Sequence, residues 1–142
     1  MSLQGPLIVV ADRPAAELSA ALSAAGAFPI VESTWADAPT AFVAVKPAAL
    51  VIAEPGRPTN ETSSRMLCLQ IATAAGPIVP VVSVTDPDGE PALPIALAAS
   101  HHHDRVVARL QSALRVRALH ATVLPSRQRC VCPGVKARWR AR

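Results

Sequence analysis

Short runs of apolar residues alternate along the chain with longer segments in which apolar positions recur every three or four residues. The runs at 6–11 (PLIVVA), 49–54 (ALVIAE) and 79–84 (VPVVSV) are almost continuously apolar. Such runs are typical of strands buried on both faces of a parallel sheet. Two weaker runs, at 27–31 and 94–98, complete a prediction of five strands.

Helical periodicity fills most of the segments between these strands. Asp37 is the expected N-cap of the second helix, and Pro39 is tolerated there because it lies in the first turn. Thr59 or Asn60 is expected to cap the third helix. The predicted helices cover about 14–25, 38–45, 60–75 and 104–123.

The order of these elements predicts an α/β domain. Strands joined by helices pair in parallel through right-handed crossovers. For five such strands we expect a flavodoxin-like, three-layer α/β/α fold with strand order 2-1-3-4-5. Between the last two strands, Pro87, Gly89, Pro91 and Pro94 leave no stretch that could nucleate a helix. The fourth crossover helix is therefore expected to be missing or reduced to a turn.

The net charge of +4 comes from the C-terminal segment 125–142, which holds six of the 14 basic residues and no acidic one. The preceding residues carry eight basic against ten acidic residues. We therefore expect a domain at 1–124 without a nucleic-acid-binding face, followed by a basic tail or linker at 125–142. The sequence shows neither a membrane span of roughly 20 apolar residues nor a signal peptide, and we expect a cytoplasmic protein.

The three cysteines are an odd number and form no disulfide framework. Cys68 lies in an apolar helical segment and is expected to be a small core residue. Cys130 and Cys132 have no second pair that would complete a tetrahedral zinc site. The histidines at 101–103 are expected to be solvated residues at a helix start, with a pH switch or a metal site as the alternative.

Chemistry in an open parallel sheet gathers beyond the carboxyl ends of the strands. In this chain those ends carry Asp12 after the first strand, Glu54 after the third, and Ser83 and Thr85 at the fourth. The sequence ADRPAAEL that follows the first strand has no glycine-rich loop. This argues against a dinucleotide site or a P-loop.

The segments PLIVVADRP, ALVIAEP, PVVSVTD and RVVARLQSALRVRAL, in this order and spacing over residues 6–120, resemble the receiver domain of bacterial two-component response regulators, which has the CheY-like form of this fold. The resemblance implies an acidic pair after the first strand, a phosphorylated Asp at the third, a Ser or Thr at the fourth and a Lys at the fifth. It also implies Mg²⁺ between the acids.

The match at these five positions is partial. The acidic pair is Ala11 and Asp12, the phosphoacceptor position holds Glu54, the switch hydroxyl is Thr85, and the lysine position falls on Ala99. Phosphoryl transfer needs cations that offset the charge on the moving group. Asp12 and Glu54 are the only candidates for a remnant acidic pocket, and Glu54 is one methylene too long for an Asp site. We therefore expect no phosphoryl cycle, no enzymatic activity and no cofactor, with Mg²⁺ only as a weak option at Asp12 and Glu54.

These observations predict a degenerate receiver, or pseudo-receiver, that serves as a protein-interaction or dimerisation module of a signalling protein. Glu54 either mimics a phosphorylated Asp or is inert. The last helix is expected to lead to an output domain, and the apolar segment PIALAA at the fifth strand favours a homodimer. Two alternatives remain: a working phosphoacceptor receiver of a phosphorelay with an atypical site, and a flavodoxin-like domain that binds a small molecule.

Overall fold

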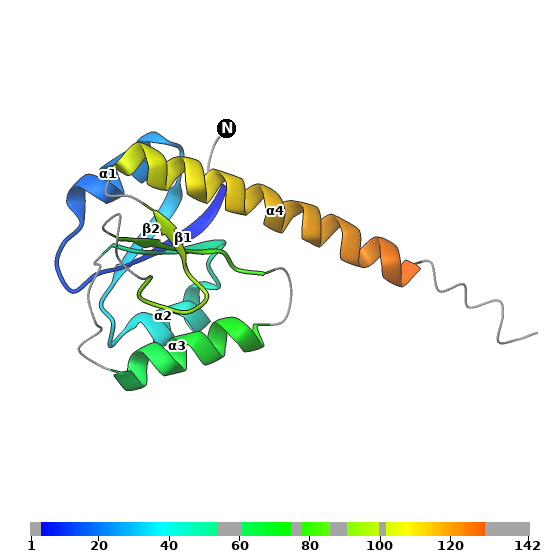
Figure 1. The fold of residues 1–142 in the computed structure, drawn as a ribbon, viewed down its shortest axis with the longest axis horizontal. Helices are drawn as coiled ribbons and strands as arrows, with labels where there is room; N and C mark the ends of the chain where they lie inside the picture. The colour runs from blue at the N-terminus through cyan, green and yellow to red at the C-terminus, as the bar shows by residue number, and fades with distance from the viewer. Residues whose placement is uncertain (1–3, 54–60, 75–77, 86–90, 100–101, 130–142) are drawn as a thin grey trace, which may run out of the picture.

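The computed structural model describes residues 4–53, 61–74, 78–85, 91–99 and 102–129. Along the chain the elements follow the predicted order (Figure 1). They are β1 (Gln4–Val10), α1 (Ala16–Ala24), β2 (Phe28–Ser33), α2 (Ala38–Val45), β3 (Ala49–Ile52), α3 (Glu61–Thr73), β4 (Val81–Val84), β5 (Leu97–Ala99) and α4 (His103–Arg129).

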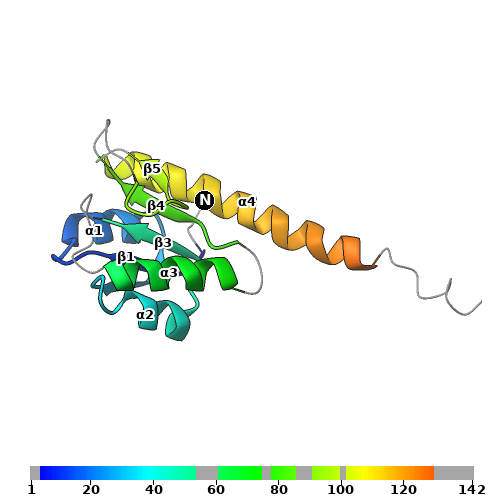
Figure 2. The ribbon, with the colours of Figure 1, turned by 60° about the horizontal axis from the view of Figure 1, so that its bottom comes forward.

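The strands form one five-stranded sheet in the order β2-β1-β3-β4-β5, and all four strand pairs are parallel. This confirms the predicted fold class and strand order. Helices α1 and α4 cover one face of the sheet, and α2 and α3 cover the other (Figures 1 and 2). The result is the expected three-layer α/β/α arrangement.

Side chains along the central strand β1 point alternately to the two faces of the sheet, and each face has its own hydrophobic core. In β1, Leu7 and Val9 pack toward α1 and α4, whereas Ile8 and Val10 pack toward α2 and α3. Every residue of β3 and β4 is buried, which explains why these strands read as continuous apolar runs. The helices contribute Leu18, Leu22, Val106 and Leu110 to the first core and Phe42 and Leu67 to the second.

The connection from β4 to β5 contains no helix in its described part, residues 91–96; residues 86–90, with Pro87 and Gly89, lie outside the described residues. The predicted start of the fifth strand at residue 94 is wrong, because β5 begins at Leu97. Leu93 turns inward and is 2% exposed, and the Ala96 N–H donates to the Leu93 carbonyl at 3.0 Å. The chain therefore completes a turn before it can pair with β4.

Two helix starts differ from the sequence prediction. The first helix begins at Ala16 rather than at Pro14. Asp37 occupies the N-cap position of α2, but its side chain makes no capping bond. Instead, the Thr34 hydroxyl donates to the Asp37 carboxylate at 3.1 Å and accepts the Asp37 N–H at 3.3 Å. The proposed caps of α3, Thr59 and Asn60, lie outside the described residues.

Helix α4 is longer than predicted. It continues past Val123 to Arg129, so the backbone remains helical across the first residues of the segment we assigned as a tail. Its first half packs on α1, β4 and β5, and its second half projects away from the body (Figures 1 and 2). Among the described residues, no helix combines the length and the apolar character needed to cross a membrane.

Candidate functional site

The carboxyl ends of β1, β3 and β4 lie side by side, because these three strands are neighbours in the sheet. The Ala53 N–H donates to the Val10 carbonyl at 3.0 Å, which places the end of β3 beside the end of β1. The Thr85 N–H donates to the Ala99 carbonyl at 2.9 Å, which places the end of β4 beside the end of β5. The fold thus brings the positions that follow these strands to one edge, as the sequence predicted.

Asp12 lies in the loop after β1 and its side chain is exposed. Its Oδ1 accepts the backbone N–H of Trp35 at 3.4 Å. Trp35 is 2% exposed and belongs to the core beneath α2 and α3, so this bond links the loop to a fixed part of the body. Ala11, at the other position of the expected acidic pair, is held through its N–H, which donates to the Ser33 carbonyl at 2.9 Å.

Glu54 lies outside the described residues, which resume at Glu61. The described chain reaches Ala53, the residue immediately before it.

Two hydroxyl residues lie at the end of β4, Ser83 within the strand and Thr85 directly after it, and both are buried. Thr85 is 2% exposed and adjoins Ala99 through its backbone bond. Ser83 is fully buried, and its Oγ accepts the N–H of Ala92 at 3.3 Å. Ser83 therefore ties the β4–β5 connection to the sheet. The sequence predicted no role for Ser83, because the hydrogen-bond partner of a hydroxyl near the end of a strand depends on how a later loop packs against it.

Ala99 is the last residue of β5 and pairs with Val84, so the position expected to hold a lysine carries only a methyl group. Within the described residues the single lysine is Lys46, which ends α2 in the left-handed conformation with φ 51°. This position lies three residues before the start of β3, at the opposite edge of the sheet. Among the described residues, no lysine can supply an ammonium group at the carboxyl edge.

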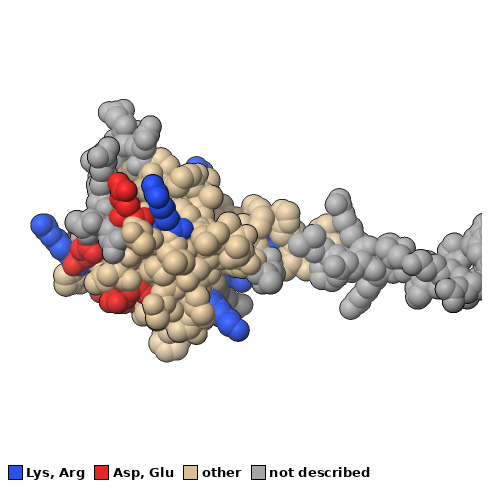
Figure 3. Space-filling view, turned by 90° about the horizontal axis from the view of Figure 1, so that it is seen from below, with Lys and Arg blue, Asp and Glu red and all other residues tan. Residues whose placement is uncertain are grey.

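Acidic residues recur where the helices begin, which in this fold is the same edge of the sheet. Glu17, Glu61 and Asp104 occupy the first turns of α1, α3 and α4, and Asp37 precedes α2. Carboxylates stabilise the positive end of a helix dipole, so a structural role suffices for them. From below, acidic side chains gather at the end of the body opposite the projecting part of α4 (Figure 3). Across the described part of the chain, no three His, Cys, Asp or Glu side chains are grouped to hold a metal ion. Of the two residues expected to form the remnant acidic pocket, the structure describes Asp12, whereas Glu54 lies outside the described residues.

Cysteines and histidines are the remaining candidates from the sequence, and the structure describes three of them. Cys68 is half-buried on α3 against the core, and burial raises the pKa of its thiol, so it is a poor nucleophile at neutral pH. His102 is exposed and His103 is half-buried at the start of α4. His101, Cys130 and Cys132 lie outside the described residues.

No protein-family model matches the sequence, and no curated protein matches it either. Among solved structures, the chain is similar to a mutant of the anti-anti-sigma factor PhyR from Bartonella quintana, with a TM-score of 0.59 and 14% sequence identity. The match covers 82% of this chain and 51% of the PhyR chain, so the chain spans about half of that protein. At this identity the comparison bears on the fold alone, and the fold of this chain is receiver-like.

Proposed function

We propose that this chain is a non-phosphorylated receiver-like signalling module, or pseudo-receiver, that acts by protein–protein interaction. The observation that carries the proposal is the side chain at the end of β5. A receiver-like sheet presents Ala99 where the family has its lysine, and the described lysine, Lys46, lies at the other edge. In addition, Ala11 stands where the family has one member of its acidic pair.

The chemistry of phosphoryl transfer explains why these two changes matter. The protein contributes mainly positioning and charge stabilisation to such a transfer. Without an ammonium group the incoming phosphoryl group lacks its counter-charge, and no three described carboxylates are grouped to hold a divalent ion. Asp12 would repel an anion rather than attract it.

Glu54 has two roles within this proposal. It either holds a negative charge toward Thr85 in permanent imitation of a phosphorylated Asp, or it is an inert carboxylate. Both roles remove catalysis from the site, so the proposal is of a protein without enzymatic activity or cofactor. The proposal also places it in the cytoplasm, with a protein partner or an output domain as the recipient of the signal. The similarity in fold to an anti-anti-sigma factor is in keeping with a protein partner.

A second candidate is a working phosphoacceptor receiver with an atypical site. Asp12 and Thr85 favour it, because both lie at the same edge as in the family's arrangement. A small-molecule site has less support, since the loop after β1 carries no glycine-rich phosphate cradle.

Incubation of the full chain with a small-molecule phosphodonor and Mg²⁺ separates the first two candidates. We expect the intact mass to show no added phosphoryl group, because Glu54, Ala11 and Ala99 replace the residues that run the transfer. A working receiver domain in a parallel reaction shows that the donor is active. A hydroxylamine-labile adduct, as expected for an acyl phosphate, that appears on the natural chain and is lost in Glu54→Gln would overturn the proposal.

A further inference from the structure

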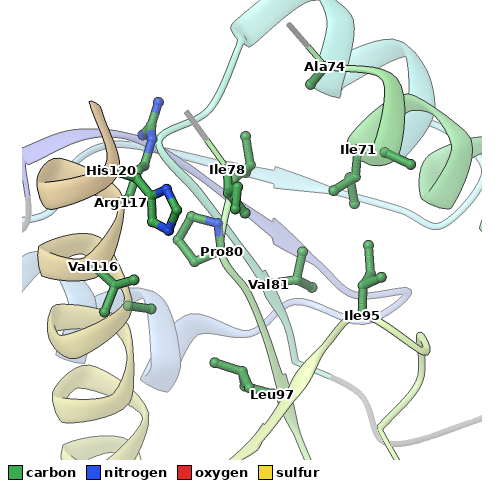
Figure 4. Close-up of a pocket in the computed structure, with 13 residues that line it drawn as sticks. Ile71, Ala74, Ile78, Pro80, Val81, Ile95, Leu97, Val116, Arg117 and His120 are labelled. Atoms are coloured by element: carbon green, nitrogen blue, oxygen red, sulfur yellow. The ribbon is translucent and has the colours of Figure 1, made fainter. Parts of the chain in front are cut away.

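Two adjoining hollows lie at the amino edge of the sheet, opposite the edge that holds Asp12 and Thr85. The first is an apolar groove of about 510 Å³ between the end of α3, the amino ends of β4 and β5, and the middle of α4 (Figure 4). The second, of about 450 Å³, lies between the ends of α2 and α3 and the same part of α4, and we term it the basic pocket. Ala74, Val79 and Arg117 line both hollows, so a single ligand can extend from one into the other.

The charges of the described residues are divided between the two edges of the sheet. The described acidic residues all lie in helix starts, loops or strand ends at the carboxyl edge, and they are Asp12, Glu17, Glu32, Asp37, Glu61 and Asp104. The groove and the basic pocket are lined instead by Lys46, Arg117 and His120, and no described acidic side chain lines either of them. The field of the described residues therefore draws an anion to the amino edge and repels it from the carboxyl edge.

Two cations from separate helices line the basic pocket. Arg117 of α4 is half-buried, and its Nη1 donates to the carbonyl of Ala48, just before β3, at 2.7 Å. A guanidinium carries five N–H donors, so this bond fixes the side chain and uses only one of them. Lys46 is exposed at the end of α2 and lines the same pocket. A carboxylate between these two side chains would gain two charge-assisted contacts.

A polar group without a partner is an independent sign of a ligand at this pocket. Gln70 of α3 lines the basic pocket, and its buried Oε1 has no hydrogen-bond partner among the described residues. A buried amide that lacks a partner is costly to the free protein. A half-turn of the amide exchanges its oxygen and nitrogen, so the same side chain can donate to a bound carboxylate. The helix dipole alone explains a cation at the end of α2, but it does not explain Gln70.

The groove beside the basic pocket offers an apolar surface on the side away from its basic residues. Ile95, Leu97 and Val116 line it and are 46%, 44% and 57% exposed. Arg117 and His120 lie together on one side of the groove, and Ile95 and Leu97 lie on the other (Figure 4). Basic groups at one end and apolar side chains at the other suit a ligand with one charged head and one apolar tail.

We propose that these two hollows bind a small amphipathic carboxylate, an aliphatic acid of medium chain length, with its carboxylate at Lys46, Arg117 and Gln70 and its tail in the groove. Both volumes lie in the range of roughly 300–1,000 Å³ that is usual for small-molecule sites. An acidic protein helix suits the surface less well, because its charges would be spread along its length while the cations gather at one end. The inference goes beyond the proposed function and does not rest on it, since this site lies at the opposite edge from the one that lacks a glycine-rich loop.

Titration of the full chain with decanoate, below the concentration at which it forms micelles, tests the inference by nuclear magnetic resonance. We expect saturable shifts of the amide resonances of Lys46, Gln70, Val79 and Arg117. Decanol has the same tail without the charge, and it should bind about tenfold more weakly. Acetate has the charge without the tail, and it should cause no saturable shift because no apolar surface is buried.

Matched variants separate the contributions of the head and the tail. Lys46→Gln should weaken decanoate binding about threefold or more and leave decanol binding unchanged. Arg105→Gln is its control, because it removes the same charge from an exposed position in the first turn of α4, at the carboxyl edge. Val116→Ser should weaken the binding of decanoate and of decanol about threefold. Val123→Ser is its control, because Val123 is 49% exposed on the same helix and does not line the groove.

A natural chain that binds no decanoate in a saturable manner would overturn the inference. So would decanol that binds as tightly as decanoate, an effect of Arg105→Gln equal to that of Lys46→Gln, or shifts centred on Asp12 and Thr85. A chain that ignores decanoate but binds a glutamate-rich amphipathic peptide at Lys46 and Arg117 would also overturn it, and would show a protein-docking surface instead.

Discussion

Replacing Leu110 with alanine is expected to lower the free energy of unfolding by about 2–5 kcal/mol. Leu110 is fully buried in the core between α4, α1 and the sheet, so the change removes packing within this core and leaves a cavity. Because this leucine lies in the half of α4 that packs on the body, its loss also weakens the attachment of the whole helix.

Leu119→Ala is the matched control on the same helix. Leu119 is 65% exposed, so its truncation should change the stability of the monomer by no more than about 0.5 kcal/mol. Urea denaturation of both variants and of the natural chain gives both values. Equal losses for the two variants would show that the packed and projecting halves of α4 are wrongly assigned.

Replacing Gly5 with alanine is expected to cost about 1–3 kcal/mol of stability. Gly5 has φ +103°, a conformation that residues with a side chain rarely adopt, and an added Cβ would lie 2.7 Å from the Cβ of Ala48. The strain arises at an irregularity in β1, where Gln4 and Gly5 both pair with Phe28. The backbone there is held close, since the Ala48 N–H donates to the Pro6 carbonyl at 2.7 Å.

A double-mutant cycle with Ala48→Gly separates the two causes of this loss. If the steric contact matters, Gly5→Ala should cost less in the Ala48→Gly background than in the natural chain, and the remaining cost reports the backbone conformation. Thermal or urea unfolding of the four proteins provides the cycle. A Gly5→Ala variant as stable as the natural chain would mean that the start of β1 is placed incorrectly.

The sheet could be predicted from the sequence because its central strands are buried on both faces. Residues of β3 and β4 have no exposed face, so their apolar runs need no periodicity to be recognised. Parallel pairing and strand order then follow from the helices between the strands. Edge strands carry a weaker signal, since half of their residues face solvent, and the start of β5 was accordingly misplaced.

Features that depend on tertiary contacts could not be predicted from the sequence. The inward turn of Leu93 fixes where β5 begins, and the burial of Ser83 depends on Ala92 returning to it. The apolar groove near the start of β4 could not be predicted either, because its lining comes from four separate elements, α3, β4, β5 and α4. The end of α4 was also missed, since Pro125 normally marks the end of a helix, whereas here it lies within one.

For the candidate site, too, the sequence predicted some features and not others. The positions of Asp12, Thr85 and Ala99 follow from counting to the ends of strands, and the structure places all three at the carboxyl edge. Their burial did not follow, because whether a strand-end side chain is covered depends on the loops around it. Thr85 is buried while Asp12 is exposed, although both follow the end of a strand within two residues.

The central claim, that the carboxyl edge no longer accepts a phosphoryl group, is tested most directly by titration of the full chain with Mg²⁺ and beryllofluoride, a mimic of a bound phosphoryl group. Amide resonances of Asp12, Ala53, Thr85 and Ala99 report on the four strand ends in a nuclear magnetic resonance spectrum. We predict that none of them shifts at concentrations that saturate a working receiver. Saturable shifts centred on these four residues, dependent on both Mg²⁺ and beryllofluoride, would contradict the account.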